Sequence, residues 1–184
     1  MLKQIQHLPN RTSNAATLLL LGRIPIEGEL HKRMLKTFGN IIRNENSVEK
    51  DIVHRQLAMK SINSGSWFPK VSEIADKYEL PSPHDIIENP PSKSQWNKTV
   101  NTVINDFYLK QLTNEAANKT SLKYLNFSST KIGSVHNIWK SAGSESFAIN
   151  MACLKMKIVT GTLILQNEKS KFSGGKLARY AKCV

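Results

Sequence analysis

The chain has 184 residues, of which 40% are hydrophobic and 22% charged, as is ordinary for a soluble globular protein with a real core. Its two cysteines exclude a disulfide framework, and the apolar run Leu18–Leu21 is far too short to span a bilayer. We expect no secretory signal, because the first residues are polar. A formal charge of +12 favours an anionic partner, nucleic acid before an acidic membrane surface, with a merely soluble basic protein as the alternative.

The N-terminal quarter predicts two helices. Ser13 is a suitable N-cap for a short helix that runs to Leu21 and is closed by Gly22. Pro25 fits the first position of the second helix, where its missing N–H is not needed. Apolar residues then recur at three- to four-residue spacing, which predicts an amphipathic helix. This apolar row comprises Ile26, Leu30, Met34, Phe38 and Ile41.

Two further helices are predicted before residue 80. Ser47 caps the first of them, with Glu49 and Asp51 in the first turn, where the helix dipole favours negative charge. Its apolar rows comprise Val48, Ile52, Gln56, Met59 and Ile62, widened by Val53 and Leu57. Ser66 begins the second and shorter helix. Its apolar residues are Phe68, Val71, Ile74, Ala75 and Tyr78.

Prolines mark two breaks in the middle of the chain. Ser82-Pro-His-Asp resembles a short capping box with Pro83 at the first helical position. Asn89-Pro-Pro is a possible semi-rigid bend and the best boundary between an N-terminal helical part, residues 1–91, and a second part, residues 92–184. One continuous domain is the alternative.

The longest helix is predicted from Lys93 to Ala117, after a second capping-box pattern that begins at Ser92. Its broad apolar face comprises Trp96, Val100, Val103, Ile104, Phe107, Tyr108 and Leu112. Trp67, Trp96 and Trp139 each lie among apolar neighbours at helical spacing. We therefore expect these three rings to anchor a core rather than to stack on bases.

The last third predicts a short helix at Ser121–Leu125 and a longer one that is capped by Ser144 and closed by Gly161. In the longer helix Phe147, Met151, Leu154 and Ile158 line up in one row. An isolated strand is conceivable at Leu163–Leu165, and Ser173-Gly-Gly-Lys is typical of a flexible hinge. No sustained period-two alternation occurs. The predicted fold class is therefore all-α: an irregular multi-helix array with a short basic, partly flexible C-terminal tail.

The positive charge is uneven along the chain. Residues 1–43 carry a net charge of +5, residues 44–92 a net charge of −3, residues 93–150 a net charge of +4 and residues 151–184 a net charge of +6. A phosphate-binding surface is therefore expected from the N-terminal helices and the tail. The predicted nucleic-acid-binding residues are Lys155, Lys157, Lys169, Lys171, Phe172, Lys176, Arg179, Tyr180 and Lys182. Phe172 and Tyr180 either stack on bases or pack against the body.

A second basic set lies nearer the N-terminus and comprises Arg11, Arg23, Lys32, Arg33, Lys36 and Arg43. Lysine and arginine contacts to phosphate give an affinity that falls steeply with salt and carries little sequence preference. We therefore expect binding to RNA or DNA that is largely independent of sequence. A solvated positive face without a partner is the alternative.

Catalytic and metal-binding patterns are weak. Asp51, Asp76, Asp85 and Asp106 are scattered, whereas a polymerase or nuclease needs carboxylates that converge on a metal. No histidine lies three or four residues from another histidine or from a cysteine, so no helical metal pair is predicted. Five histidines are expected to be structural or at the surface: His7, His31, His54, His84 and His136. Neither a catalytic residue nor a cofactor is predicted.

The two cysteines are expected to differ. Cys153 is predicted on the core side of its helix, as a small hydrophobic residue. Cys183 lies in a polar basic tail, beside Lys182, where the thiol is more readily ionised. A structural zinc site needs four ligands, and this tail offers at most one. We therefore predict no zinc within these 184 residues.

Several short strings occur in a recognisable order. They are Leu21-Gly-Arg-Ile-Pro-Ile-Glu, Arg55-Gln-Leu-Ala-Met-Lys, Ser66-Trp-Phe-Pro-Lys, Tyr78-Glu-Leu-Pro-Ser-Pro, Pro90-Pro-Ser-Lys-Ser-Gln-Trp, Ser121-Leu-Lys-Tyr-Leu and Lys157-Ile-Val-Thr-Gly-Thr-Leu-Ile-Leu-Gln, followed by Lys171-Phe172 and Cys183. From about Leu18 to the end, this order resembles the region after the reverse transcriptase core in invertebrate non-LTR retrotransposon polyproteins. In a longer parent protein the resemblance implies a zinc knuckle, with Cys183 as its first ligand.

The function expected from the sequence is that of a non-catalytic nucleic-acid-binding segment. The resemblance places it between a polymerase core and a zinc knuckle, where it would help to hold template RNA or target DNA. The polymerase motif of paired aspartates is absent from the chain, so we expect no enzyme activity. Two alternatives stay open: a helical protein–protein interaction module and a degenerate retroelement fragment without activity. The expected location is intracellular, either nuclear or cytoplasmic, with no membrane partner and with the oligomeric state undetermined.

Overall fold

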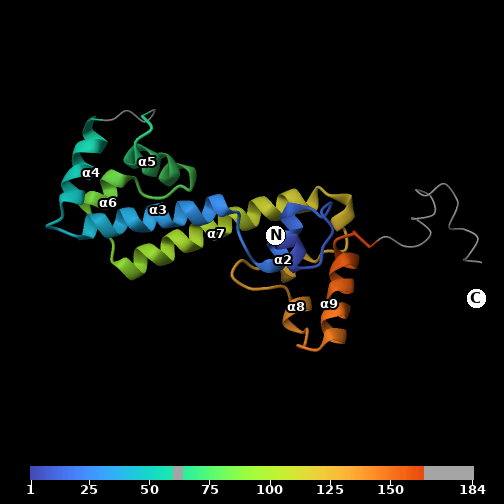
Figure 1. The fold of residues 1–184 in the computed structure, drawn as a ribbon. Coiled ribbons are helices and arrows are strands. Elements are labelled where there is room, and N and C mark those ends of the chain that lie inside the picture. The colour runs from blue at the N-terminus through green and yellow to red at the C-terminus, as the bar shows by residue number, and fades with distance from the viewer. Residues whose placement is uncertain (60–63, 164–184) are drawn as a thin grey trace, which may run out of the picture. The chain divides into compact units, whose positions relative to one another are not determined.

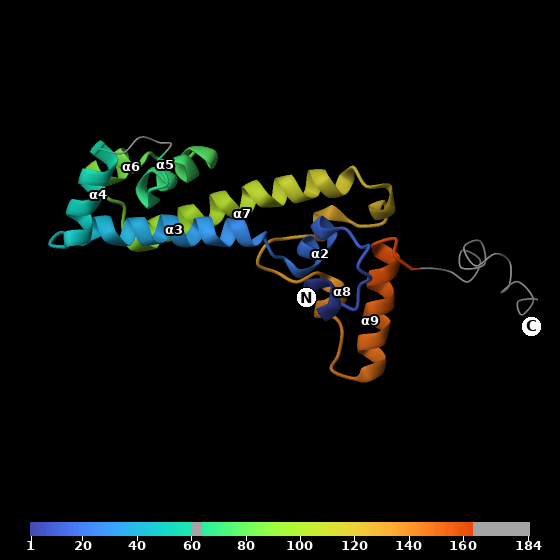
Figure 2. The same ribbon diagram turned by 45° about the horizontal axis from the view of Figure 1, so that its top comes forward.

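The computed structural model describes residues 1–59 and 64–163 and shows nine α-helices and two short 3-10 helices within them. Its described residues contain no strand beyond a single isolated bridge, which confirms the predicted all-α class. The chain forms two compact units (Figures 1 and 2). Unit 1 comprises residues 1–22 and 112–184, and unit 2 comprises residues 23–111. The predicted tail, with its hinge at Ser173, lies outside the described residues.

Unit 2 is built from four helices and most of a fifth. They are α3 (Ile26–Arg43), α4 (Val48–Met59), α5 (Trp67–Lys77), α6 (Pro83–Glu88) and the part of α7 (Lys93–Ala117) that ends at Gln111. Helices α3 and α7 lie side by side in both views (Figures 1 and 2). The bend at Asn89-Pro-Pro lies inside unit 2, between α6 and α7.

The predicted long helix is confirmed with the same bounds, Lys93–Ala117. Its apolar face is buried as expected at Trp96, Val100, Ile104, Tyr108 and Leu112, whereas Val103 is half-buried and Phe107 is exposed. The Trp96 ring is an anchor of unit 2, because its indole N–H donates to the Leu35 carbonyl at 2.9 Å.

The apolar row predicted for α3 is wrong at its start, although Phe38 is buried as expected. Ile26 is 75% exposed and Leu30 is 51% exposed. The buried side of the helix instead comprises Gly28, Lys32, Leu35, Phe38, Gly39 and Ile42. The buried side of α3 is thus rotated about the helix axis relative to the prediction. Two glycines explain this rotation, because they let aromatic rings of α7 approach closely. A Cβ on Gly28 would lie 2.5 Å from Tyr108, and one on Gly39 would lie 2.5 Å from Trp96.

The rows predicted for α4 are largely wrong, although Val53 is buried as expected. Val53 is the one fully buried residue of this helix, while Val48 and Met59 are among its most exposed side chains. Ile62 lies outside the described residues. The row predicted for α5 holds, because Val71, Ile74, Ala75 and Tyr78 are all buried.

The predicted helix starts are largely confirmed. Ser82 and Asp85 form a complete capping box, with Pro83 at the first position. The Ser47 and Ser92 hydroxyls accept backbone N–H groups at 3.2 and 3.3 Å, respectively. Pro25 lies one residue before the position expected, at the N-cap of α3 rather than in its first turn.

Unit 1 joins the first residues of the chain to the last third. Its helices are α1 (Leu2–Ile5), α2 (Asn14–Leu21), the end of α7, η1 (Thr120–Leu122), η2 (Phe127–Ser129), α8 (Asn137–Lys140) and α9 (Ser146–Val159). Helix α2 has the predicted boundaries, with Ser13 before it and Gly22 after it in the left-handed conformation. The helix expected at Ser121–Leu125 is a 3-10 turn that ends at Leu122.

Two backbone hydrogen bonds fasten α2 to the loop before α8. The Gly133 N–H donates to the Gly22 carbonyl at 2.7 Å, and the His136 N–H donates to the Leu20 carbonyl at 2.9 Å. Gly22 has a φ of +60°, and a Cβ there would collide with the backbone of Ser134. Glycine is therefore required at the place where these distant segments of the sequence meet.

Helix α9 differs from its prediction at the N-terminus and in its buried face. It begins at Ser146 with Glu145 as the N-cap, not at the Ser144 cap. The buried residues are Ala152, Cys153 and Met156, so the core-side prediction for Cys153 is confirmed. The aligned row of Phe147, Met151, Leu154 and Ile158 lies at the surface instead. At Leu163 no strand is assigned, and positions 164–165 fall outside the described residues.

Candidate nucleic-acid interface

The two units contain equal numbers of cations but differ in their acids. Counted over the whole sequence, unit 1 contains 13 Lys and Arg with three Asp and Glu, a net charge of +10. Unit 2 contains 13 Lys and Arg with 11 Asp and Glu, a net charge of +2. Nearly all of the excess positive charge of the chain therefore belongs to unit 1.

The cations of unit 1 lie mostly at the surface. Its described basic residues are Lys3, Arg11, Lys119, Lys123, Lys131, Lys140, Lys155 and Lys157, and six of these are exposed. Lys3 and Lys157 are half-buried. Within the described part of this unit one ion pair forms, between Lys119 and Glu115 at 3.8 Å. The remaining positive groups are not neutralised by a described carboxylate, which favours attraction of an anion.

Arg11, from the second basic set, is held beside the end of α9, the helix that contains Lys155 and Lys157 of the C-terminal set. The Arg11 guanidinium donates from Nη2 to the Thr162 carbonyl at 2.8 Å. The Thr162 N–H in turn donates to the Lys157 carbonyl at 2.8 Å. Gly161, with a φ of +61°, makes the turn between them. Arg11 is thereby held near the last turn of α9, at Thr162, which lies 151 positions away in the sequence.

The predicted C-terminal set is described only in part. Lys155 is exposed on α9, and Lys157 is half-buried on the same helix. The other members lie outside the described residues: Lys169, Lys171, Phe172, Lys176, Arg179, Tyr180 and Lys182. Cys183 lies there as well. The role of this segment in binding therefore stays a prediction from its composition.

The second basic set is divided by the structure, and Lys32 is placed wrongly by the sequence prediction. Lys32 is buried in unit 2, where Nζ donates to Asn105 Oδ1 at 2.7 Å and to Glu29 Oε1 at 3.3 Å. An ammonium group that is buried and shared between two protein acceptors is not available to a phosphate. The prediction failed because the glycine positions turn α3 and bring Lys32 onto its inner side.

The other cations of α3 have different surroundings. The Arg43 guanidinium donates to the Pro91 carbonyl at 3.2 Å and to Asn40 Oδ1 at 2.7 Å. Arg33 is exposed, and so is Arg23, which precedes the helix, while Lys36 is half-buried. Unit 2 therefore uses two cations of the predicted set, Lys32 and Arg43, to join its own segments.

A network of polar side chains links α3, α5 and α7 within unit 2. The Tyr78 hydroxyl lies 2.7 Å from His31 Nδ1 and donates to the Tyr108 hydroxyl at 3.2 Å. Lys77 pairs with Glu27 at 2.6 Å, and its hydrogen bond to that carboxylate lowers the pKa of Glu27 and raises the pKa of Lys77.

Burial shifts two further groups of this network. It raises the pKa of Tyr78, with the hydrogen bond to Tyr108 adding to the effect. It lowers the pKa of His31, and the nearby Lys77 acts in the same direction. Both shifts favour the neutral form of the side chain, so the network holds helices together through neutral hydrogen bonds and one exposed ion pair.

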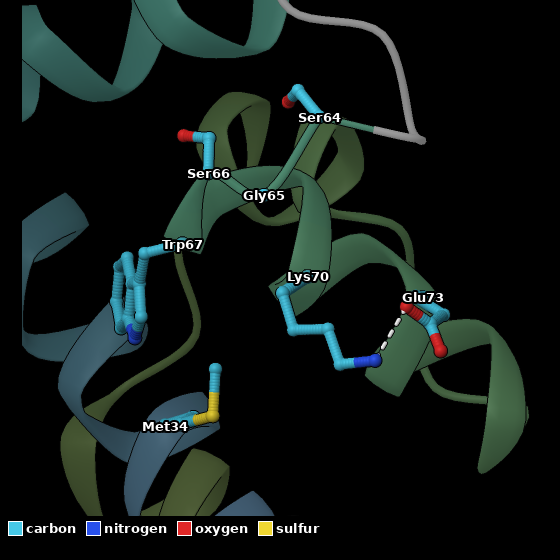
Figure 3. A pocket seen from close by; sticks show the side chains of 7 residues that line it. All are labelled: Met34, Ser64, Gly65, Ser66, Trp67, Lys70 and Glu73. Atoms are coloured by element: carbon cyan, nitrogen blue, oxygen red, sulfur yellow. Dashed lines mark hydrogen bonds and ion pairs between the residues drawn. The ribbon is translucent and has the colours of Figure 1, made fainter.

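Unit 2 contains a pocket of about 500 Å³ beside the start of α5 (Figure 3). Met34 lines it from α3, and the segment Ser64–Trp67 lines it from the other side, together with Lys70 and Glu73 of α5. Lys70 and Glu73 neutralise each other at 2.7 Å. Ser66 Oγ, the hydroxyl at the N-cap of α5, already donates to Gln56 at 2.8 Å. Lys70, Glu73 and Ser66 are thus already engaged, whereas the buried Ser64 hydroxyl has no hydrogen-bond partner among the described residues.

The scattered carboxylates do not converge in the described residues. Asp85 accepts hydrogen bonds from the Ser82 backbone and hydroxyl, and these bonds lower its pKa. Among residues 1–59 and 64–163 no group of three or more His, Cys, Asp or Glu side chains could hold a metal ion. His136 is buried and structural: its Nδ1 accepts from the Ile138 N–H at 3.3 Å, and burial lowers its pKa.

Comparisons of the chain with family models, with curated proteins and with solved structures found no match. None of the described helices combines the length and the apolar character that a bilayer crossing requires.

Two features of unit 1 escape the sequence-based prediction. The contact between Arg11 and the end of α9 has no local signal, because the two segments lie at opposite ends of the chain. The surface position of the aligned apolar residues of α9 also has no local signal, because a row of four apolar residues equally indicates a buried face. The sequence does not indicate which side of α9 is covered by the rest of unit 1.

Proposed function

We propose that this protein is a non-catalytic nucleic-acid-binding segment, and that unit 1 makes the contacts to phosphate. The concentration of the charge excess in that unit is the observation that carries the proposal: unit 1 has a net charge of +10 and unit 2 one of +2. The resemblance to the region that follows the polymerase core of non-LTR retroelements supports the same class of ligand.

The chemistry follows from the residue types. Lysine and arginine bind phosphate through charge and N–H donors, and they release condensed counterions when they do so. The hydrogen bond from Arg11 to the Thr162 carbonyl holds this cation beside the end of α9, where the basic C-terminal segment begins. A polyanion that binds there could contact both ends of the sequence at once. Because such contacts read the backbone rather than the base edges, we expect similar affinity for different sequences.

The direct test is a titration of the purified chain with labelled single-stranded and duplex nucleic acid at two salt concentrations. The proposal predicts binding at low salt that weakens steeply as salt is raised, for unrelated sequences alike. A matched variant replaces the five cations of the C-terminal segment with glutamine: Lys169, Lys171, Lys176, Arg179 and Lys182. This variant should bind with a smaller salt dependence. No binding at low salt, or equal binding by both proteins, would contradict the proposal.

A helical interaction module is the second candidate, because α9 presents an uncovered apolar row. This candidate predicts an association with a protein that tolerates salt better than phosphate binding does. The two candidates concern different side chains and are compatible with each other.

A further inference from the structure

Helix α9 presents a regular apolar row to solvent. Phe147, Met151, Leu154 and Ile158 are 76, 37, 40 and 47% exposed, respectively. Their spacings of four, three and four residues place them along one line of the helix, as the a and d positions of a coiled coil are placed. We call these four residues the α9 row. Isolated exposed apolar residues are ordinary on protein surfaces, whereas a continuous row marks an interaction site.

The remainder of unit 1 holds α9 from the other side. Ala152, Cys153 and Met156 are buried, and α8 packs beside α9 (Figures 1 and 2). In heptad positions, with Met151 at a and Leu154 at d, these buried residues occupy b, c and f. Helix α9 therefore has one face held within unit 1, and its coiled-coil face is not covered by the described residues.

Two lysines border the α9 row on opposite sides. Lys155 follows Leu154 at the e position, and Lys157 precedes Ile158 at the g position. Neither lysine has a carboxylate partner in the described part of the chain. Residues at e and g lie beside the corresponding residues of a partner helix and thereby decide which helices pair. Acidic side chains on the partner would complement both lysines.

We propose that the α9 row is a docking site for an amphipathic helix of a partner protein, whose apolar seam is flanked by Glu or Asp. The partner would insert its apolar side chains between the four residues of the row, and its carboxylates would pair with Lys155 and Lys157. This inference rests on the geometry of α9 and does not depend on nucleic-acid binding.

Charge argues against the occupants that the chain itself could supply. A second copy would bring the same two lysines, and the whole of unit 1 has a net charge of +10, so both copies would repel each other at this face. Residues 164–184 contain five Lys and Arg and one Glu, so they do not complement the row either. The exposed apolar residues of α4 are flanked by Glu49 and Asp51 but also by Lys50 and Arg55, which cancel the attraction.

The width of the row argues against a membrane surface. A helix that lies in a bilayer interface buries a broad apolar face, whereas a strict a and d row is the narrower seam that pairs with another helix. On α9 the row is bordered by Ala148 and Lys155 on one side and by Asn150 and Lys157 on the other. The row therefore has the width of one helix contact.

The test uses a fluorescein-labelled peptide of about three heptads, with Leu and Ile at a and d and Glu at e and g. Fluorescence anisotropy measures its binding to the full chain. A second peptide has Lys in place of every Glu, and a third retains the Glu residues but has Ser at a and d. The proposal predicts binding of the first peptide only, weakened but not abolished by salt.

Variants locate the binding. Leu154→Gln and Ile158→Gln should each weaken the Glu peptide by at least roughly tenfold, because each removes a central apolar contact. Ile26→Gln is the matched control: Ile26 is an aliphatic residue of unit 2 that is 75% exposed, and its substitution should leave the affinity unchanged. The double variant Lys155→Glu, Lys157→Glu should reverse the preference and bind the Lys peptide.

Four outcomes would overturn the proposal. They are failure of the Glu peptide to bind, equal binding of the Glu and Lys peptides, equal losses for Leu154→Gln and Ile26→Gln, and self-association that Leu154→Gln abolishes. A further experiment measures binding of the chain and of Leu154→Gln to vesicles that contain anionic lipid. If α9 is a membrane face, Leu154→Gln will reduce vesicle binding and the peptides will not bind.

Discussion

Unit 1 and unit 2 contain the same number of cations but use them differently. In unit 2, which has 11 acidic residues, Lys70 and Lys77 pair with carboxylates and Lys32 is buried between two acceptors. In the described part of unit 1, which has only Glu115 and Glu145 as acids, one such pair forms. The local supply of acids thus decides whether a lysine stabilises the fold or remains available to a ligand, and a count of basic residues alone does not.

The largest expected effect on stability concerns the interior of unit 2. Trp96→Ala removes a buried ring and its hydrogen bond to the Leu35 carbonyl, and we expect a loss of about 3–5 kcal/mol in the free energy of unfolding. Trp67→Ala is the matched control, because Trp67 is only half-buried. Urea unfolding measures both variants. Equal losses for the two would contradict the assignment of Trp96 as the anchor.

A pair of glycines tests the turn after α9 in unit 1. Gly133 and Gly161 both have positive φ, but only at Gly161 would a Cβ collide with the Ser121 carbonyl, while the space around Gly133 is open. We expect Gly133→Ala to cost about 1–2 kcal/mol through backbone strain alone. Gly161→Ala should cost at least about 1 kcal/mol more because of the added overlap. Thermal unfolding measures the difference, and the reverse order would show that this turn is not packed as described.

Lys32 and Arg33 are neighbouring cations of α3, and substitutions of both distinguish a buried cation that stabilises the fold from an exposed one that does not. Lys32→Met removes the ammonium that Asn105 and Glu29 share, and we expect a loss of about 1–3 kcal/mol. Arg33→Met removes an exposed charge and should change stability by less than about 0.5 kcal/mol. Urea unfolding of both variants checks this. Similar small effects would mean that Lys32 is solvated after all.

The smallest expected effect is a dependence on pH. Burial lowers the pKa of His136 below its ordinary value of 6.5, so the unfolded chain binds this proton more readily than the folded chain does. The stabilisation is therefore complete above pH 6.5 and declines as the pH falls through 6.5 towards the lower folded pKa. His136→Asn keeps a capping acceptor but does not titrate.

The measurement is thermal unfolding of both proteins at pH 7 and pH 5. The difference in melting temperature between the two pH values should be smaller for His136→Asn than for the unmodified chain. Because His31 in unit 2 shifts in the same direction, some dependence on pH should persist in the variant. An unchanged difference would show that His136 does not contribute to the acid sensitivity.

The sequence predicts those features that depend on local chemistry. The start of α7 at the Ser92 cap, the end of α2 at Gly22 and the capping box of Ser82 and Asp85 are predicted, because each of these signals lies within a few residues of the helix end that it defines. The all-α class follows from the same helical periodicity. The long apolar face of α7 is predicted correctly because it is broad enough to tolerate a small error in rotation.

The errors concern the direction in which a helix faces. The predicted apolar rows of α3 and α9 reach the surface at Ile26 and Phe147, which are among the most exposed apolar residues. Periodicity reports that apolar residues share a side and does not report what covers that side. On α3, Gly28 and Gly39 decide the outcome, because the rings of α7 fit against positions without side chains.

The difference in net charge between the two units could not be predicted from the sequence pattern either. Unit 1 is assembled from residues 1–22 and 112–184, so its lack of acids becomes visible only when the segments are grouped in space. Along the chain the same charges appear as two positive ends and an acidic middle. The structure assigns part of the first positive end, from Arg23 to Arg43, to the charge-balanced unit.

The central claim is that a polyanion binds to unit 1 rather than to positive charge in general. The most direct test compares two variants in which three cations of matched exposure become glutamine: Arg11, Lys155 and Lys157 in unit 1, and Arg23, Arg33 and Lys36 in unit 2. The measurement is the slope of the logarithm of the binding constant against the logarithm of the salt concentration, for one single-stranded oligonucleotide. We predict that the unit 1 variant lowers this slope by about 2 and weakens binding. The unit 2 variant should leave both nearly unchanged, and equal losses in the two variants would contradict the account.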